Sequence, residues 1–134
     1  MKLEEYRSVE NWFYNRKRPY AEGTKEVYIK YMELFRKILD KTPDHIVNIV
    51  KVSARPIDEM ENIEKQLAFA MKSMDMKVRS IHQRLNALHG FWRANGIRLT
   101  PEILKQVRSR VAERFPHLAL RKGEYIDRSR PSSG

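Results

Sequence analysis

Residues 78–96 form the sharpest amphipathic pattern in this chain. Apolar side chains recur at intervals of four, three and four residues, at Ile81, Leu85, Leu88 and Trp92. At 100° per residue, this spacing places all four in one narrow stripe of an α-helix. Ser80 is placed to cap the first turn, and Asn95-Gly96 predicts the end of the helix, because both residues tolerate the left-handed conformation. A chain with this segment must bury one side of a helix.

The other side of this helix is polar and contains no acid from Arg79 to Arg93. Its members are Arg79, Gln83, Asn86, Gly90 and Arg93. The Gln and Asn amides can donate to and accept from an adenine edge, and arginine can pair with guanine or bind phosphate. Gly90 leaves room for close approach. The alternative interpretation is a solvated helix face that happens to lack acids.

The charge is distributed unevenly along the 134 residues, which suit a single domain. Residues 1–76 hold 14 Lys/Arg and 13 Asp/Glu, whereas residues 77–134 hold 13 Lys/Arg and 4 Asp/Glu. This asymmetry favours a polyanionic partner such as DNA, RNA or an anionic membrane over a basic surface kept for solubility. The chain has no run of 18 apolar residues, no secretory signal pattern and no cysteine, so we expect an intracellular protein without membrane spans or disulfides.

Two further helices are expected before residue 41. Val9, Trp12 and Phe13 follow helical spacing after Ser8, a fair cap, and the basic run at residues 15–19 ends that segment. The cations in this run can contact phosphates or simply line an exposed loop. A second helix is predicted over residues 25–40, with Thr24 as its cap and its aromatic residues in the core.

Three more helical segments follow, two of them opened by a Thr-Pro-acid sequence. Thr42-Pro43-Asp44 and Thr100-Pro101-Glu102 place proline at the first helical position, where its missing N–H costs nothing. Residues 57–74 read as a Met-rich helix whose apolar side holds Ile57, Met60, Leu67, Met71 and Met74, and whose exposed side holds Glu59, Glu61 and Glu64. No alternating strand pattern persists, so the fold is predicted to be all-α.

The sequence offers no constellation typical of an enzyme. His45, His82, His89 and His117 match no metal-ligand spacing, and no glycine-rich phosphate loop is present. His82 and His89 are expected at the surface or against phosphate. We therefore expect no catalytic site, no metal, no cofactor and no small-molecule substrate.

Three motifs resemble the core-binding domain of tyrosine recombinases, the phage-integrase family. Residues 80–92, Ser-Ile-His-Gln-Arg-Leu-Asn-Ala-Leu-His-Gly-Phe-Trp, resemble its "T-i-x-x-x-L-s-A-L-r-x-F-y" helix. Thr24-x3-Tyr28-x3-Met32-x2-Phe35 is similar to its "T-x3-Y-x3-L-x2-F" helix, and residues 42–46 to its "l-T-p-e-d-I" start. The resemblance covers residues 8–96.

The resemblance implies a SAM-like bundle of four to six orthogonally packed helices that clamps double-stranded DNA through residues 24–40 and 80–95. It implies that Thr24 and Lys25 meet the DNA backbone, that Arg79 and Ser80 meet phosphate, and that Gln83, followed by Asn86, reaches base edges. The full candidate set is Thr24, Lys25, Lys77, Arg79, Ser80, Gln83, Arg84, Asn86 and Arg93.

The resemblance also implies a domain organisation. Residues 1–120 would form the DNA-binding domain, and residues 121–134 a flexible tail or the start of a linker to a catalytic domain that this chain lacks. Such a protein would work in the cytoplasm at the nucleoid, with possible self-association on DNA. The alternative from another class is a helical protein-interaction or oligomerisation module without DNA binding, and RNA remains a third possible partner.

Overall fold

Six α-helices build the protein in the computed structural model, which describes residues 2–114 and, within them, all side chains except those of residues 108 and 110–114. After a short 3-10 turn, η1 (Leu3–Glu5), come α1 (Arg7–Tyr14), α2 (Glu22–Leu39), α3 (Pro43–Val52), α4 (Pro56–Ser73), α5 (Val78–Ala94) and α6 (Pro101–Arg114). The described residues contain no strand, so the all-α prediction is confirmed. The expected tail at residues 121–134, His117 and the side chains of Arg110 and Arg114 lie outside the described part.

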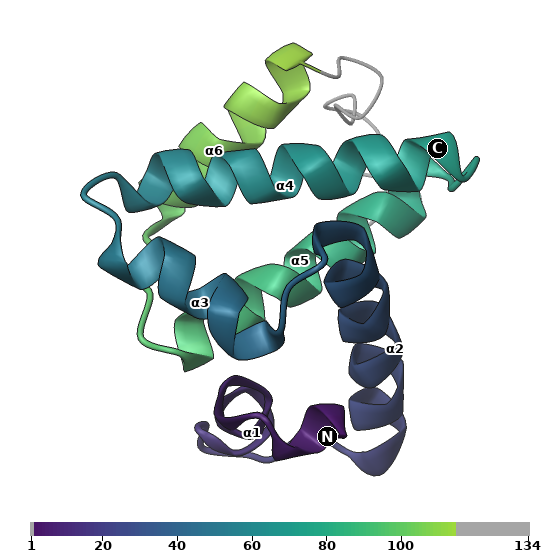
Figure 1. Ribbon diagram of the computed structural model, residues 1–134, viewed down its shortest axis with the longest axis vertical. Helices are drawn as coiled ribbons and strands as arrows, with labels where there is room; N and C mark the ends of the chain where they lie inside the picture. The colour runs from purple at the N-terminus through teal and green to yellow at the C-terminus, as the bar shows by residue number, and fades with distance from the viewer. Residues whose placement is uncertain (1, 115–134) are drawn as a thin grey trace, which may run out of the picture.

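The central helix is α5, which passes between α1 and α4 (Figure 1). Helix α4 packs against α6 on one side and against α2 and α3 on others. Helix α2 runs across α4 rather than alongside it (Figure 1). The predicted stripe of α5 is buried in full, at Ile81, Leu85, Leu88 and Trp92. Through this buried stripe, α5 packs against the helices on both sides of it.

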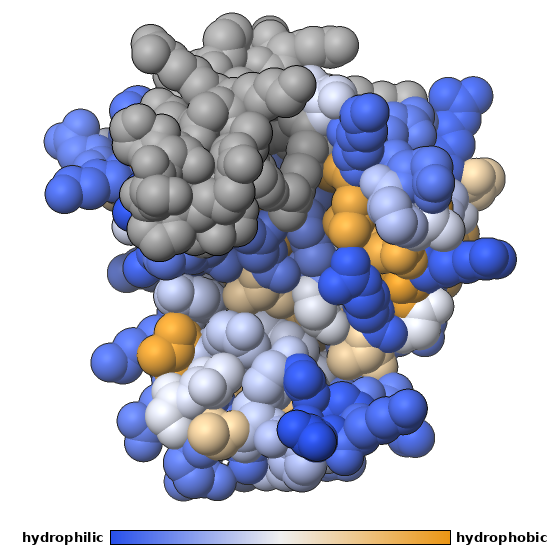
Figure 2. Space-filling model, turned by 180° about the vertical axis from the view of Figure 1, so that it is seen from behind, coloured by the Kyte–Doolittle hydropathy of each residue, from blue (hydrophilic) through white to orange (hydrophobic). Residues whose placement is uncertain are grey.

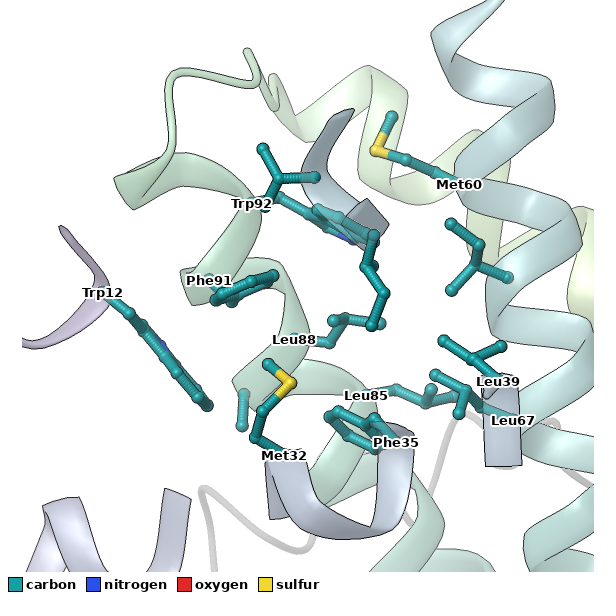
Figure 3. Packing of buried hydrophobic residues seen from close by; sticks show 14 of the residues in the cluster. Trp12, Met32, Phe35, Leu39, Met60, Leu67, Leu85, Leu88, Phe91 and Trp92 are labelled. Atoms are coloured by element: carbon teal, nitrogen blue, oxygen red, sulfur yellow. The ribbon is translucent and has the colours of Figure 1, made fainter. Parts of the chain in front are cut away.

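The core is one continuous cluster to which every helix contributes. Phe91 and Leu88 of α5 lie between Trp12 of α1 and Leu67 of α4 (Figure 3). The Trp12 ring stacks on Tyr28 with centroids 4.8 Å apart and meets Phe91 edge-on at 5.2 Å. Such aromatic pairs add about 0.5–1.5 kcal/mol each beyond area burial. The apolar side of α5 faces this core, so its polar side is left to solvent.

The end of α5 is held by side chains as well as by its backbone. Asn95 follows the last helical residue and Gly96 has φ +81°, so the predicted stop is confirmed. The buried Asn95 amide donates to the carbonyl oxygens of Ser8 (3.0 Å) and Phe91 (2.9 Å), and its Oδ1 accepts from Asn11 Nδ2 (3.0 Å). These bonds join α5 to α1.

Three of the predicted caps are wrong. Helices α1, α2 and α5 begin before Ser8, Thr24 and Ser80, because their N-cap residues are Tyr6, Ala21 and Lys77. None of these N-cap residues makes a side-chain cap hydrogen bond. The local hydrogen-bonding preference of Ser8, Thr24 and Ser80 therefore does not set where these helices begin.

Helix α4 departs from its prediction at three positions. Glu61, predicted on the exposed side, pairs with Lys65 and its side chain is only 13% exposed. Met74 lies just beyond the helix and is 53% exposed, so it does not belong to the apolar side. Glu64, predicted on the exposed acidic side, is only 1% exposed. The remaining methionines of this helix, Met60 and Met71, are buried in the core as expected.

The two Thr-Pro starts make the cap bond expected of them: Thr42 Oγ1 accepts from the His45 backbone N–H at 3.2 Å, and Thr100 Oγ1 accepts from the Ile103 backbone N–H at 3.2 Å. We expect Thr42→Ala to lower the free energy of unfolding by about 1 kcal/mol, because the His45 N–H loses its partner. Urea denaturation with an unchanged m-value measures the loss. Thr42→Ser, which keeps the hydroxyl, is the control, and equal loss in both variants would contradict the capping role.

Candidate nucleic-acid interface

The polar side of α5 is exposed as a continuous strip. Four side chains at helical spacing, Arg79, Gln83, Asn86 and Arg93, lie at the surface, and no acidic residue occurs anywhere in the helix. The N-cap residue Lys77 is exposed as well. The structure therefore brings together four of the nine candidate residues as one basic and amide-bearing surface, and Lys77 precedes the first turn of the helix. Each of these side chains can donate to a phosphate or to a base edge.

Ser80 and Arg84 do not belong to this strip. Arg84 Nη1 donates to the Ser80 carbonyl oxygen at 3.1 Å, and the Arg84 guanidinium lies over the Tyr31 ring of α2, 4.6 Å from its centroid. Both residues are half-buried. Arg84 thus joins α5 to α2, and its contacts indicate a structural role for a side chain that we expected on DNA.

The loop between α1 and α2 lies beside the C-terminal half of α5. Asn15 Nδ2 donates to the Ala94 carbonyl oxygen at 2.9 Å, and Tyr20 approaches α5 at Gly90. Between these two anchors the exposed cations Arg16, Lys17 and Arg18 extend the positive surface. The run of three cations is visible in the sequence, but only the fold places it next to α5.

A row of tyrosines supports this loop. The Arg16 guanidinium lies 3.8 Å from the Tyr20 ring centroid, Tyr20 meets Tyr28 edge-on at 5.0 Å, and Tyr28 lies 6.0 Å from Tyr31. Arg84 then covers Tyr31. Burial, followed by the neighbouring tyrosines, raises the pKa of Tyr28 above its ordinary value. The row fixes the position of the basic loop relative to α5.

Thr24 and Lys25 lie in different surroundings. Lys25 Nζ donates to the Tyr14 hydroxyl (3.1 Å) and pairs with Glu22 (3.1 Å), and these two interactions raise its pKa, the hydrogen bond to Tyr14 most. The hollow next to Lys25 is lined by four carboxylates, Glu4, Glu10, Glu22 and Glu26. Negative side chains at this position oppose a phosphate backbone. Thr24, in the same first turn of α2, is half-buried.

His89 is buried, which corrects its predicted surface position. The residue is 3% exposed, and Nε2 lies 2.9 Å from Oε1 of the buried Glu64 on α4. This pair joins the two central helices and is unavailable to phosphate. His82 is half-buried. The described residues include no group of three or more His, Cys, Asp and Glu side chains arranged to hold a metal ion.

An apolar hollow of about 600 Å³ opens where α3 ends and α4 begins. Figure 2 shows an orange strip among charged side chains at that edge of the molecule. Its apolar lining is formed by Val50, Ala54, Pro56, Ile57, Met60, Ile97 and Ile103.

Among the helices described, none is both long and apolar enough to cross a bilayer.

Comparison with known protein families, curated proteins and solved structures finds no match to this chain. The recombinase resemblance therefore rests on the three sequence motifs.

Proposed function

We propose that this protein binds double-stranded DNA through one surface, the basic face, which combines the exposed strip of α5 with the neighbouring loop. The basic face consists of Arg16, Lys17, Arg18, Lys77, Arg79, Gln83, Asn86 and Arg93. The observation that carries the proposal is the placement of the three loop cations beside a helix face that has no acid. Lys25, Ser80 and Arg84 are left outside because their contacts are structural or acidic, and Thr24 is left outside because it is half-buried.

The basic face offers separate groups for affinity and for specificity. Its cations supply phosphate contacts, which dominate affinity and make binding depend on salt. Gln83 and Asn86 lie in the middle of the exposed side of α5, and the major groove admits a helix whose amides read adenine. Modest sequence preference on top of strong phosphate binding follows from this arrangement.

The sequence motifs favour one biological setting for such a domain. We propose that the chain serves as the core-binding domain of a tyrosine recombinase, acting at the nucleoid and assembling with further copies on DNA. In that setting the chemistry of strand exchange belongs to another domain, and this chain positions the duplex.

Fluorescence-anisotropy titration with a mixed-sequence duplex at two salt concentrations tests the proposal. We expect binding that weakens steeply with salt, at about 0.9 logarithmic units of affinity per unit of log salt for each phosphate contact. Single-stranded DNA and duplex RNA run alongside as competitors. Absence of duplex binding at low salt would reject DNA binding, and a preference for RNA would reassign the same face.

Two variants separate the roles within the basic face. Arg79→Ala is expected to weaken binding to all duplexes alike and to lower the salt slope by about 1, because a phosphate contact is lost. Gln83→Ala should instead reduce the difference between preferred and other sites, by about 1–3 kcal/mol of discrimination. A panel of duplexes measured with both variants tests this division, and unchanged affinity of both would remove this face from the interface.

The apolar hollow beside α3 and α4 supports a second candidate, the protein-interaction module. An apolar depression of this size accommodates a few side chains of a partner. Sedimentation of the chain without DNA at low and high salt distinguishes the two. Self-association that is independent of salt, together with no DNA binding, would favour the interaction module.

A further inference from the structure

The hollow where α3 ends and α4 begins has an apolar floor. Val50, Met60 and Ile97 are buried, whereas Ile57 and Ile103 are half-exposed and give the hollow an apolar surface that solvent reaches. These five side chains come from α3, α4, α6 and the segment after α5, so the hollow exists only in the folded bundle. An exposed apolar depression with a polar rim is typical of a site where another molecule binds.

The rim of the hollow is positively charged. Lys51, Arg55 and Arg98 line it and are exposed, and Asp58 is the only acid among the described residues of the lining. Asp58 Oδ2 lies 3.8 Å from Arg55 Nη1, so this acid is paired within the rim. Lys51 and Arg98 form no ion pair with any side chain that the structure describes. Two positive charges beside an apolar floor are therefore left for a partner.

These two cations lie at the same part of the rim. A Cβ built on Gly96 would lie 3.6 Å from Lys51 Nζ, which places the ammonium beside the backbone just past α5. The C-terminal end of a helix carries partial negative charge, which favours a cation in this position. Arg98 follows Gly96 by two residues. Like charges held close together attract an anionic group.

Charge and shape together define the occupant of the hollow. The orange strip of Figure 2 is elongated, and blue, charged side chains lie along it. Such a strip suits a peptide, which places several side chains in a row along a groove. The phosphate backbone of a duplex does not suit it, because apolar side chains offer no hydrogen-bond donor.

We propose that this hollow docks an acidic peptide segment of a partner protein. Apolar side chains of the segment fill the strip over Ile57 and Ile103, and its carboxylates pair with Lys51 and Arg98. The proposal specifies the chemistry of the partner in a protein-interaction role. It does not depend on DNA binding, because the hollow and the basic face share no residue.

Selection of random peptides displayed on phage, with the full chain as the bait, tests the chemistry of the occupant. We expect the enriched peptides to share apolar residues flanked by aspartate or glutamate. Synthetic, fluorescently labelled forms of these peptides are then titrated with the parent, with Lys51→Glu and with Arg98→Glu. Each reversal is expected to weaken binding about tenfold, because like charges then face each other. Lys72→Glu, which reverses an exposed lysine at the other end of α4, is the matched control and should bind as the parent does.

A second selection, on the chain that carries both Lys51→Glu and Arg98→Glu, tests whether charge selects the partner. We expect lysine or arginine in place of the acids in the newly enriched peptides. Circular dichroism shows whether each variant is folded, and Arg98→Gln, which only removes the charge, replaces a variant that is not.

Several results would overturn the proposal. They are enriched peptides without acids, no enrichment at all, and equal peptide binding by the parent and both reversals. Self-association of the parent that Arg98→Glu abolishes would also overturn it, because a second copy would then occupy the hollow. A parent chain that selects acidic peptides but binds no duplex would instead reject the basic face and leave the docking site in place.

Discussion

Glu64→Ala is expected to lower the free energy of unfolding by about 3 kcal/mol, the largest stability effect expected here. The sequence pattern places Glu64 on the exposed side of its helix, where the same substitution would have little effect. Glu64 and His89 are both buried and lie 2.9 Å apart, joining α4 to α5. Removing the carboxylate leaves the His89 nitrogen in the core without its partner and opens a cavity at the centre of the bundle. Chemical denaturation followed by circular dichroism measures the loss.

Glu59→Ala is the control for this variant. It removes the same charge from the same helix, at a side chain that is half-exposed, and should change stability by no more than about 0.5 kcal/mol. Glu64→Gln, which keeps an oxygen that can accept from His89, should lose less than Glu64→Ala. Equal stability of the Glu64→Ala variant and the parent would show that the pair does not stabilise the contact between the helices.

Replacing Arg16, Lys17 and Arg18 together with alanine is expected to weaken duplex binding on the order of 100-fold at low salt and to lower the salt slope by about 2–3. The three cations lie beside α5, because Asn15 and Tyr20 anchor the loop on that helix. Losing them removes half of the cations of the basic face. Anisotropy titrations across a series of salt concentrations measure both quantities.

A matched triple variant tests whether net charge alone explains the effect. Arg36, Lys37 and Lys41 lie at the other end of α2, in a hollow that also contains Glu33 and Asp40. Their replacement with alanine lowers the net charge by the same three units, and we expect a change of only a few-fold. Equal losses in the two triple variants would mean that charge, and not the position of the loop, drives binding.

Local features of the sequence determined much of the helical framework. The stripe of α5, the Thr42-Pro43 start of α3 and the Asn95-Gly96 end of α5 are confirmed. Each depends on residues within a few positions of one another, so periodicity and capping chemistry suffice to predict it. The exposure of Arg79, Gln83, Asn86 and Arg93 follows from the same periodicity, since they lie opposite the buried stripe.

Contacts between distant segments were decided only by the tertiary structure. Glu64 and His89 are 25 residues apart, and nothing in the local pattern of either helix shows that one carboxylate finds a buried partner. The loop cations reach α5 through bonds that span 79 residues, from Asn15 to Ala94. Lys25 of α2 likewise donates to the hydroxyl of Tyr14, the last residue of α1. Sequence periodicity determines which side of a helix is polar, whereas packing determines which polar sides come together, because such contacts depend on how the helices cross in space.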